Sequence, residues 1–407
     1  MSVKWRTLVL LALAELLAMS LWFSASAVTP SLMDRWQLTA GQASWLTMTV
    51  QVGFVVGALA SALFNVADIW EPRRVFAGGA LAGAAMTALI PVVDAFVPVL
   101  LLRVGTGVAL AAVYPVGMKI MATWTKEDRG LGLGLLVGAL TVGSASPHLV
   151  RGLGSVTQWR GVLFVVAALA VISAFMVLQF GRLGPYRGPA PRFRWSYMSQ
   201  ALRHRPLRLA NFGYFGHMWE LYAMWTWIPA FLAVAYASAP PDSIVHRIGP
   251  DRAAALGAFA VIAMGGIGSL VAGTLADHWG RTRTTIAAMV ASGASALVIG
   301  LFTNGHPVLV TLVALFWGLT IVADSAQFST AISELGEPAY MGTLLTTQTS
   351  LGFLLTLVSI RLVPELVARI GWTGAFAVLA IGPAFGSLAM WRLKQSPAAQ
   401  QLAGGRG

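Results

Sequence analysis

The sequence E-L-L-A-M-S-L-W at residues 15–22 returns as E-L-Y-A-M-W-T-W at residues 220–227. Five of the eight positions are identical, and each copy begins with a glutamate, Glu15 or Glu220. Both glutamates lie inside apolar runs long enough to cross a lipid bilayer. An ionisable side chain at the centre of a membrane span costs about 2.5–3.5 kcal/mol on insertion scales, so such a residue indicates function. Its presence at matching places in two halves of the chain indicates a duplicated transporter with a site near the bilayer midplane.

The composition indicates a protein of the lipid bilayer. Hydrophobic residues make up 57% of the 407 residues and charged residues only 10%, whereas a soluble domain carries about 25% charged residues. We therefore predict an all-α membrane protein with twelve transmembrane helices, each near the roughly 20 residues needed to cross the bilayer. The expected spans are 7–28, 42–64, 75–93, 97–121, 131–151, 161–180, 209–237, 253–275, 284–303, 307–330, 341–362 and 371–391.

The charge distribution predicts the orientation of these spans. The net charge is +12, and the segments on the side of the two termini hold 18 Lys and Arg residues against 7 on the other side. Cytoplasmic loops carry this excess, so we expect a multi-pass protein of the inner membrane with both termini in the cytoplasm. The basic residues are then explained by topology and anionic lipid rather than by nucleic acid. The chain has no cysteine, which excludes disulfides and thiol chemistry.

The N-terminal run imitates a secretory signal, because Lys4 and Arg6 precede an apolar stretch that ends in Ser24-Ala25-Ser26-Ala27. Glu15 interrupts this stretch, and its copy at Glu220 lies far from any leader position. We therefore expect the run to be retained as the first span.

A basic linker divides the chain into two halves. Residues 181–208 hold seven arginines and four prolines. We predict an N-terminal six-helix bundle over residues 1–180, the cytoplasmic linker over 181–208, a C-terminal six-helix bundle over 209–392 and a cytoplasmic tail over 393–407. Two further motifs recur in the same order, Ala-Asp-x-Trp at 67–70 and 276–279 and Trp-x-Gly at 159–161 and 372–374, which supports the duplication.

The loop after the eighth predicted span reads Gly273-Thr-Leu-Ala-Asp277-His-Trp-Gly280-Arg281-Thr-Arg283. Together with the duplication and the basic linker, this loop resembles the major facilitator superfamily, whose loop motif is G-x-x-x-D-R-x-G-R-x-R. The first-half copy keeps Asp68, Arg73 and Arg74 but has Glu71 and Pro72 in place of Gly-Arg. The resemblance implies two pseudo-symmetric six-helix bundles, the major facilitator fold. It also implies that Asp68, Arg73, Arg74, Asp277, Arg281 and Arg283 gate the inner face.

Two more motifs accompany the resemblance. Arg103-Val-Gly105-Thr-Gly107 in the fourth span fits the arginine motif of the family, which implies a role for Arg103 in coupling. Arg103 stays charged and therefore needs an acidic partner or an anionic substrate, although a side chain that snorkels toward the membrane surface is the alternative. Gly138, Gly143 and Pro147 follow the antiporter motif of the fifth span only loosely.

The repeated glutamates are the leading candidates for proton coupling. In this family the first and seventh spans face the central cavity, which implies that Glu15 and Glu220 share it. A desolvated carboxyl favours its neutral form and releases its proton when water reaches it. Asp324, isolated in the tenth span, is the third carrier candidate. The alternative is that these carboxylates are structural, for example as partners of Arg103.

Aromatic and polar side chains on the same helix faces are the candidates for substrate binding. Residues at i, i+4 and i+7 share a face of a helix. The candidates are Met19, Trp22, Tyr114, His217, Tyr222, Met224, Trp227 and Gln327. His217 lies one turn before Glu220. Its alternative roles are a proton relay, a substrate contact and a core histidine. An acidic, aromatic cavity favours a cation or an amphipathic drug, whereas Arg103, His217 and Lys119 leave an organic anion open.

These residues predict a secondary active transporter that moves a small organic solute by alternating access, coupled to protons. We expect neither an enzyme nor a cofactor, because no H-E-x-x-H or G-x-S-x-G pattern is present. The His217, Glu220 and Glu15 set is too thin to predict a metal site. We expect a monomer. The alternative function is an uncoupled facilitator or a channel-like uniporter for a small anion.

Overall fold

The structure is a computed structural model that describes residues 2–126, 129–154, 158–186 and 194–407, while the side chains of residues 67, 68, 129 and 130 lie outside the described part. The helices before residue 181 are α1 (Val3–Met19), α2 (Ser24–Ala27), α3 (Thr29–Trp36), α4 (Ala40–Ala43), α5 (Trp45–Leu63), α6 (Val66–Ile69), α7 (Pro72–Val93), α8 (Phe96–Ala111), α9 (Tyr114–Ala122), α10 (Arg129–Leu153) and α11 (Trp159–Phe180). The later helices are α12 (Trp195–Met198), α13 (Gln200–Arg203), α14 (Arg205–Ala237), α15 (Ile244–Ile248), α16 (Pro250–Trp279), α17 (Arg281–Val298), α18 (Pro307–Ile321), α19 (Ser325–Leu335), α20 (Met341–Leu379) and α21 (Ile381–Lys394). Three 3₁₀ segments are η1 (Ile299–Phe302), η2 (Pro338–Tyr340) and η3 (Pro397–Gly405).

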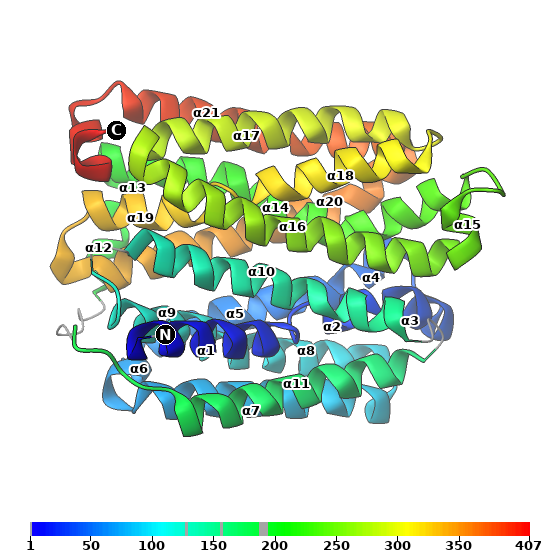
Figure 1. The fold of residues 1–407 in the computed structure, drawn as a ribbon, viewed down its shortest axis with the longest axis horizontal. Helices are drawn as coiled ribbons and strands as arrows, with labels where there is room; N and C mark the ends of the chain where they lie inside the picture. Colours follow the sequence, from blue (N-terminus) through cyan, green and yellow to red (C-terminus); the bar gives the residue numbers. More distant parts are fainter. Residues whose placement is uncertain (1, 127–128, 155–157, 187–193) are drawn as a thin grey trace.

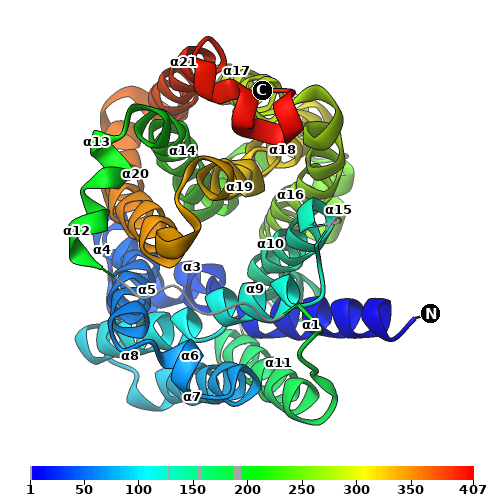
Figure 2. The same cartoon turned by 90° about the vertical axis from the view of Figure 1, so that its left-hand side faces the viewer.

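The long helices run side by side in two groups (Figure 1). Seen from one end, the helices of the first half of the chain lie below those of the second half (Figure 2). The groups meet where α10 packs on α16 and α5 packs on α20. Both termini lie toward the end of the molecule that carries α6, α12 and α13, and α3 and α15 mark the opposite end (Figure 1). This all-α architecture confirms the predicted fold class, while the boundaries of the two bundles stay a prediction.

Nine segments of the described chain are long and apolar enough to cross a membrane. One of them, Pro338–Lys394, covers two predicted spans, and its backbone turns at Gly371, whose φ is +69°. Glycine tolerates this left-handed value, which other residues avoid. The helices that carry Glu15 and Glu220 are not among the nine. The count of twelve spans therefore stays a prediction, although each predicted span coincides with helix in the structure.

Three predicted spans are interrupted by two or more residues that belong to no helix. Span 7–28 breaks between α1 and α2, span 97–121 between α8 and α9, and span 307–330 between α18 and α19. At the second break Pro115 lies in the first turn of α9, and its missing N–H cannot continue the hydrogen-bond ladder of α8. Non-helical backbone at membrane depth is tolerated where it is buried in protein or lines a cavity. The breaks therefore direct attention to the space between the two groups of helices.

Small residues let α5 and α8 approach closely. A Cβ added at Gly107 would overlap the Val50 carbonyl oxygen, and one added at Gly53 would overlap the Val104 carbonyl oxygen. Helices in membranes associate through such close backbone contacts, because lipid offers no hydrophobic driving force between them. The crossing of α5 and α8 thus depends on the absence of side chains at these positions.

Replacing Gly107 with alanine should destabilise the protein. The new methyl group must push α8 away from α5, and overpacking of this kind costs about 1–3 kcal/mol. The control is Gly78→Ala on α7, where an added Cβ meets nothing within 4 Å. Thermal unfolding of the purified protein should show a lower melting temperature for Gly107→Ala and an unchanged or higher one for Gly78→Ala. Equal melting temperatures for the two variants would contradict the close crossing.

Candidate functional site

A cavity lies between the two groups of helices, next to all three helix breaks. Trp22 comes from the segment after α1, Tyr114 begins α9, and Val322 and Ser325 flank the break before α19. The other walls are formed by α10, α14 and α20. The cavity measures about 70 Å³, well below the roughly 300–1,000 Å³ of sites that enclose a drug-sized ligand. The structure therefore represents a conformation in which the site is nearly closed.

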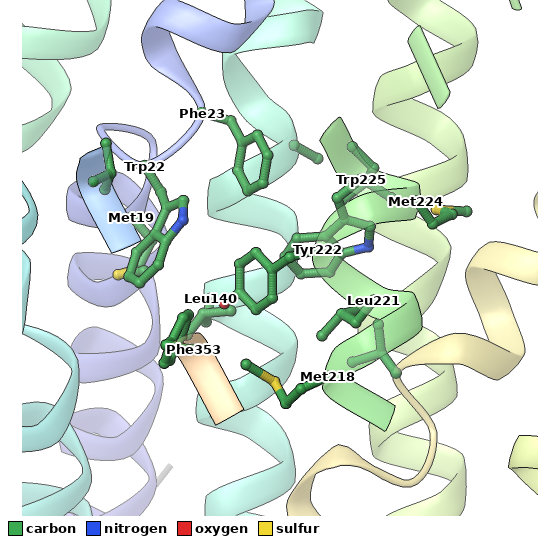
Figure 3. Packing of buried hydrophobic residues seen from close by; sticks show 14 of the residues in the cluster. Met19, Trp22, Phe23, Leu140, Met218, Leu221, Tyr222, Met224, Trp225 and Phe353 are labelled. Carbon is green, nitrogen blue, oxygen red and sulfur yellow. The ribbon is translucent and has the colours of Figure 1, made fainter. Parts of the chain in front are cut away.

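Aromatic rings from both halves of the chain meet at this cavity. Trp22 lies 5.8 Å from Tyr222 and 5.4 Å from Phe353, measured between ring centroids. Tyr222 lies 5.0 Å from Phe353 and 5.4 Å from Trp225. Figure 3 shows Trp22, from the segment after α1, Tyr222, from α14, and Phe353, from α20, pointing toward one another. Ring separations of 4.5–7 Å are favourable for aromatic pairs, so this aromatic cluster stabilises the closed cavity.

Hydroxyl groups form the polar part of the cavity wall. Tyr114, Thr141, Tyr214 and Tyr222 supply four, and Ser325, Ser329 and Thr349 supply the others. Among the described residues that line the cavity, none is acidic or basic. The wall therefore offers hydrogen-bond donors and acceptors together with aromatic faces. This differs from the acidic cavity that the sequence led us to expect.

Glu220 lies inside the C-terminal half rather than on the cavity wall. Its side chain is 1% exposed. Trp317 Nε1 donates a hydrogen bond to Oε1 at 2.7 Å, and Ser292 Oγ donates one to Oε2 at 2.9 Å. The cavity-lining face of α14 is instead formed by Tyr214, Met218, Leu221, Tyr222 and Trp225. One step along a helix turns a side chain by about 100°, so the Glu220 carboxyl points toward α17 and α18.

Glu15 is fully buried in the N-terminal half. Neither carboxyl oxygen has a hydrogen-bond partner within the described part of the chain. The carboxyl lies so close to α9 that a Cβ added at Gly117 would come within 2.5 Å of Oε2. Glu15 does not line the cavity, although Tyr114, at the start of the same helix α9, does. The two glutamates thus lie in separate interiors in this conformation, and their shared cavity stays a prediction.

The structure brings together a pair that the sequence did not join. His217 Nδ1 lies 2.8 Å from Asp324 Oδ1, and the two side chains are 1% and 2% exposed. Asp324 lies in the break between α18 and α19, and the next residue, Ser325, lines the cavity. The pair therefore links α14 to the broken helix directly behind the cavity wall.

Among the residues that the structure describes, Arg103 has no acidic partner, contrary to expectation. Its guanidinium donates to the carbonyl oxygens of Leu46 at 3.1 Å and Leu21 at 3.0 Å, to Ser24 Oγ at 3.0 Å, and to the Trp22 carbonyl oxygen. Two of these acceptors, the carbonyl oxygens of Leu21 and Trp22, belong to the break between α1 and α2, and Ser24 begins α2. Their freed carbonyl groups need donors inside a membrane, and the fully buried arginine supplies them. Arg103 therefore neither snorkels nor points to a substrate in this conformation.

Three of the eight predicted substrate-binding residues line the cavity: Trp22, Tyr114 and Tyr222. The others pack within the two halves. Trp227 Nε1 donates to the Ile360 carbonyl oxygen at 2.9 Å, and Gln327 Oε1 accepts from Arg281 at 2.8 Å. Met19 and Met224 are fully buried, and Met224 points away from the cavity across α14 (Figure 3).

The loop motif of the second half forms a network within its own half. Arg281 donates to both carboxylate oxygens of Glu334 at 2.8 and 2.7 Å and lies 3.5 Å from Asp277. It thereby joins the start of α17 to the end of α19. Arg283 is exposed and has no ion pair among the described residues.

The degenerate loop of the first half is held by the residue that departs from the motif. Glu71 accepts from Arg73 Nε at 2.6 Å and pairs with Arg74 at 3.0 Å. Arg73 also donates to the Gly181 carbonyl oxygen at 3.0 Å, which ties α7 to the start of the linker. The Asp68 side chain lies outside the described residues. The gating role of both loops stays a prediction.

Ser325, Ser329 and Thr349 line the cavity and were not predicted from the sequence. Their signal was present in part, because Ser325 and Ser329 are spaced i and i+4 on one face of a largely apolar span. Ser292 and Trp317, which hold Glu220, gave no comparable signal, since partners on other helices cannot be identified from spacing along the chain.

Removing the guanidinium of Arg103 should destabilise the segment between α1 and α2, whose carbonyl groups it holds. Arg103→Leu leaves buried carbonyl groups unpaired, and each costs about 1–3 kcal/mol. We expect a clearly lower melting temperature for Arg103→Leu, a partial loss for Arg103→Lys and none for Arg6→Leu, an exposed arginine outside the cavity. A variant at Arg103 that melts like the wild type but cannot concentrate substrate would contradict the structural role and favour coupling.

Comparisons with known proteins agree with the predicted family and fold. The profile of the family described as the Major Facilitator Superfamily matches residues 11–360. The "Probable L-galactonate transporter" of Escherichia coli (strain K12) is 24% identical over 365 residues, which cover 78% of each protein. The crystal structure of a mutant of the nucleoside transporter NupG matches with a TM-score of 0.72 and 17% identity, over 96% of this chain and 100% of that one. The last similarity concerns the fold.

Proposed function

We propose that this chain, which belongs to the Major Facilitator Superfamily, couples the movement of a neutral, hydroxyl-rich solute to protons. Membership confirms the resemblance predicted from the sequence and makes the protein a multi-pass membrane transporter of small solutes rather than an enzyme. The coupling ion, the substrate class and the alternating-access mechanism are our proposals. So are its monomeric state and its place in the inner membrane with both termini in the cytoplasm.

The His217–Asp324 pair carries the proposal of proton coupling. The 2.8 Å contact joins α14 to the segment between α18 and α19, and both elements contribute cavity-lining residues. In a medium of low dielectric constant, two opposite charges at this distance attract each other strongly. A proton that neutralises Asp324 removes the charge that holds His217. Proton binding thereby loosens the wall of the cavity, which is the physical link that coupled transport requires.

Glu220 and Glu15 are the additional carriers in this proposal. Glu220 is held by two neutral donors, Trp317 and Ser292, so no fixed positive charge prevents it from accepting a proton. Glu15 has no hydrogen-bond partner in the described chain, and an unpaired ionised carboxylate is costly inside a protein. The neutral acid is therefore the form that fits the surroundings of Glu15 in this conformation.

Contacts between the two halves support alternating access. Arg252 Nε, in the first turn of α16, donates to the carbonyl oxygen of Gly152, in the last turn of α10, at 2.8 Å. Thr356 donates to Gln51 across the interface of α20 and α5. These few polar contacts accompany close packing of α10 on α16. Rocking the halves about this interface, which repeat-built transporters use to expose a midplane site to either side, would break them in turn.

The cavity wall supports a neutral substrate with several hydroxyl groups and one flat face. Serine, threonine and tyrosine hydroxyls can each donate and accept a hydrogen bond. Trp22, Tyr222 and Trp225 offer ring faces for stacking. Sugars and nucleosides combine these features. The cavity of about 70 Å³ must widen to hold either, so substrate binding would separate the aromatic cluster and begin the opening of the halves.

A sugar acid is the second candidate substrate, favoured by the relative named as a probable L-galactonate transporter. An acid carries a negative charge at neutral pH, and a buried charge needs a partner. No basic side chain lines the cavity among the described residues, and the guanidinium of Arg103 is occupied by four acceptors. Its transport would require a rearrangement of the N-terminal half.

Counterflow in proteoliposomes distinguishes the two substrate classes. We expect a nucleoside or a neutral sugar to exchange with its radiolabelled form, and L-galactonate to exchange at least about tenfold more slowly, because an unpaired charge costs several kcal/mol on burial. The measurement is label uptake against a preloaded lumen. Faster exchange of the acid would reverse the order of the candidates.

Neutralising Asp324 should separate transport from its driving force. We expect Asp324→Asn to abolish uphill uptake driven by a pH gradient, because the variant cannot bind and release a proton, and to retain counterflow. The control is Asp242→Asn, since Asp242 is an exposed loop residue. Uphill uptake at the wild-type level in Asp324→Asn would remove this residue from the mechanism. Uptake by the wild type without any effect of the pH gradient would favour a facilitator.

A further inference from the structure

A second cavity lies at the end of the molecule that carries the termini, between the first turns of α14 and the last turns of α21. Its volume is about 340 Å³. Arg205 and Arg208 line it from α14, and Arg392 lines it from α21. The two helices cross closely one turn further along, where a Cβ added at Gly216 would overlap the Gly382 carbonyl oxygen. The cavity is thus separate from the central one and opens on the outside of the helix bundle.

The three arginines leave this cavity strongly positive. None of them has an ion pair with an acidic side chain within the described residues, and Arg208 donates only to the Leu202 carbonyl oxygen at 3.4 Å. Arg205 and Arg392 are exposed, and Arg208 is half-buried. The N-terminus of α14 adds its partial positive charge, because helix dipoles sum toward that end. Three convergent guanidinium groups without a carboxylate are suited to bind a phosphate group.

The rest of the cavity is apolar and faces away from the protein core. Phe212 and Phe385 lie 5.4 Å apart, measured between ring centroids, and form part of the wall. Phe385 is 48% exposed and Leu388 is 44% exposed. On a helix that lies in a bilayer, such side chains contact acyl chains. A soluble anion would use the arginines and leave these apolar side chains without a role.

We propose that this cavity binds an anionic glycerophospholipid, with the headgroup phosphate on Arg205, Arg208 and Arg392 and an acyl chain along Phe212, Phe385 and Leu388. Basic pockets between transmembrane helices at the membrane surface bind such headgroups. The occupied site would bridge α14 and α21, two helices of the C-terminal half that pack directly on each other. The bound lipid therefore stabilises this half of the transporter.

The test is thermal unfolding of the full-length, delipidated protein with three additives: dioleoylphosphatidylglycerol, dioleoylphosphatidylcholine and inorganic phosphate. Of the three additives, we expect only phosphatidylglycerol to raise the melting temperature, by at least about 2 °C. In Arg208→Gln/Arg392→Gln this gain should vanish. The matched control, Arg6→Gln/Arg182→Gln, loses the same charge from exposed arginines outside the cavity and should keep the gain. Native mass spectrometry should show at least about tenfold weaker phosphatidylglycerol binding in the first variant only.

Four results would overturn the proposal. An equal gain in both double variants would show that the lipid acts elsewhere. An equal gain from phosphatidylcholine would show that the site does not select charge, and an equal gain from inorganic phosphate would identify a free anion rather than a lipid as the occupant. A wild-type protein that phosphatidylglycerol does not stabilise would contradict it as well.

Discussion

A polar group buried in this protein must find its partner inside the protein, because the bilayer supplies none. The three most demanding groups solve this in different ways. Arg103 donates to the carbonyl groups of the broken first span, Glu220 accepts from two neutral donors, and His217 faces Asp324. Every one of these contacts joins segments that are distant in the sequence. They therefore determine how each helix is rotated about its axis. That rotation decides which side chains reach the central cavity.

The broken helices and the aromatic cluster belong to one arrangement. The segment after α1 carries Trp22 into the cavity, and Arg103 holds that segment by its backbone. On the opposite side, the segment before α19 carries Asp324 behind the wall and Ser325 onto it. The N-terminal half thus contributes the ring of Trp22, whose backbone Arg103 holds, and the C-terminal half contributes the His217–Asp324 pair. A solute that parts Trp22 from Tyr222 acts on both halves at once.

The sequence predicted the helices well and their rotation poorly. Hydropathy and the repeated Glu15 and Glu220 placed every span on helix, because burial in lipid demands long apolar runs whatever their packing. From the sequence, the face of α14 that carries Glu220 was predicted to line the cavity. In the structure Met218 and Tyr222 line it, and Glu220 points into the interior of the C-terminal half. Either face of α14 is apolar enough to line the cavity or to pack inside the C-terminal half. The hydrogen bonds from Ser292 and Trp317 therefore decide which way Glu220 points. Such partners on other helices leave no pattern along one chain.

The central claim is that His217 and Asp324 connect proton binding to the state of the cavity. Its most direct test is the proton flux that substrate itself induces, followed with a pH-sensitive dye trapped in proteoliposomes without an imposed gradient. The account predicts a substrate-dependent pH change for the wild type. It predicts none for Asp324→Asn, although this variant still exchanges substrate. An undiminished pH change in that variant would contradict the account.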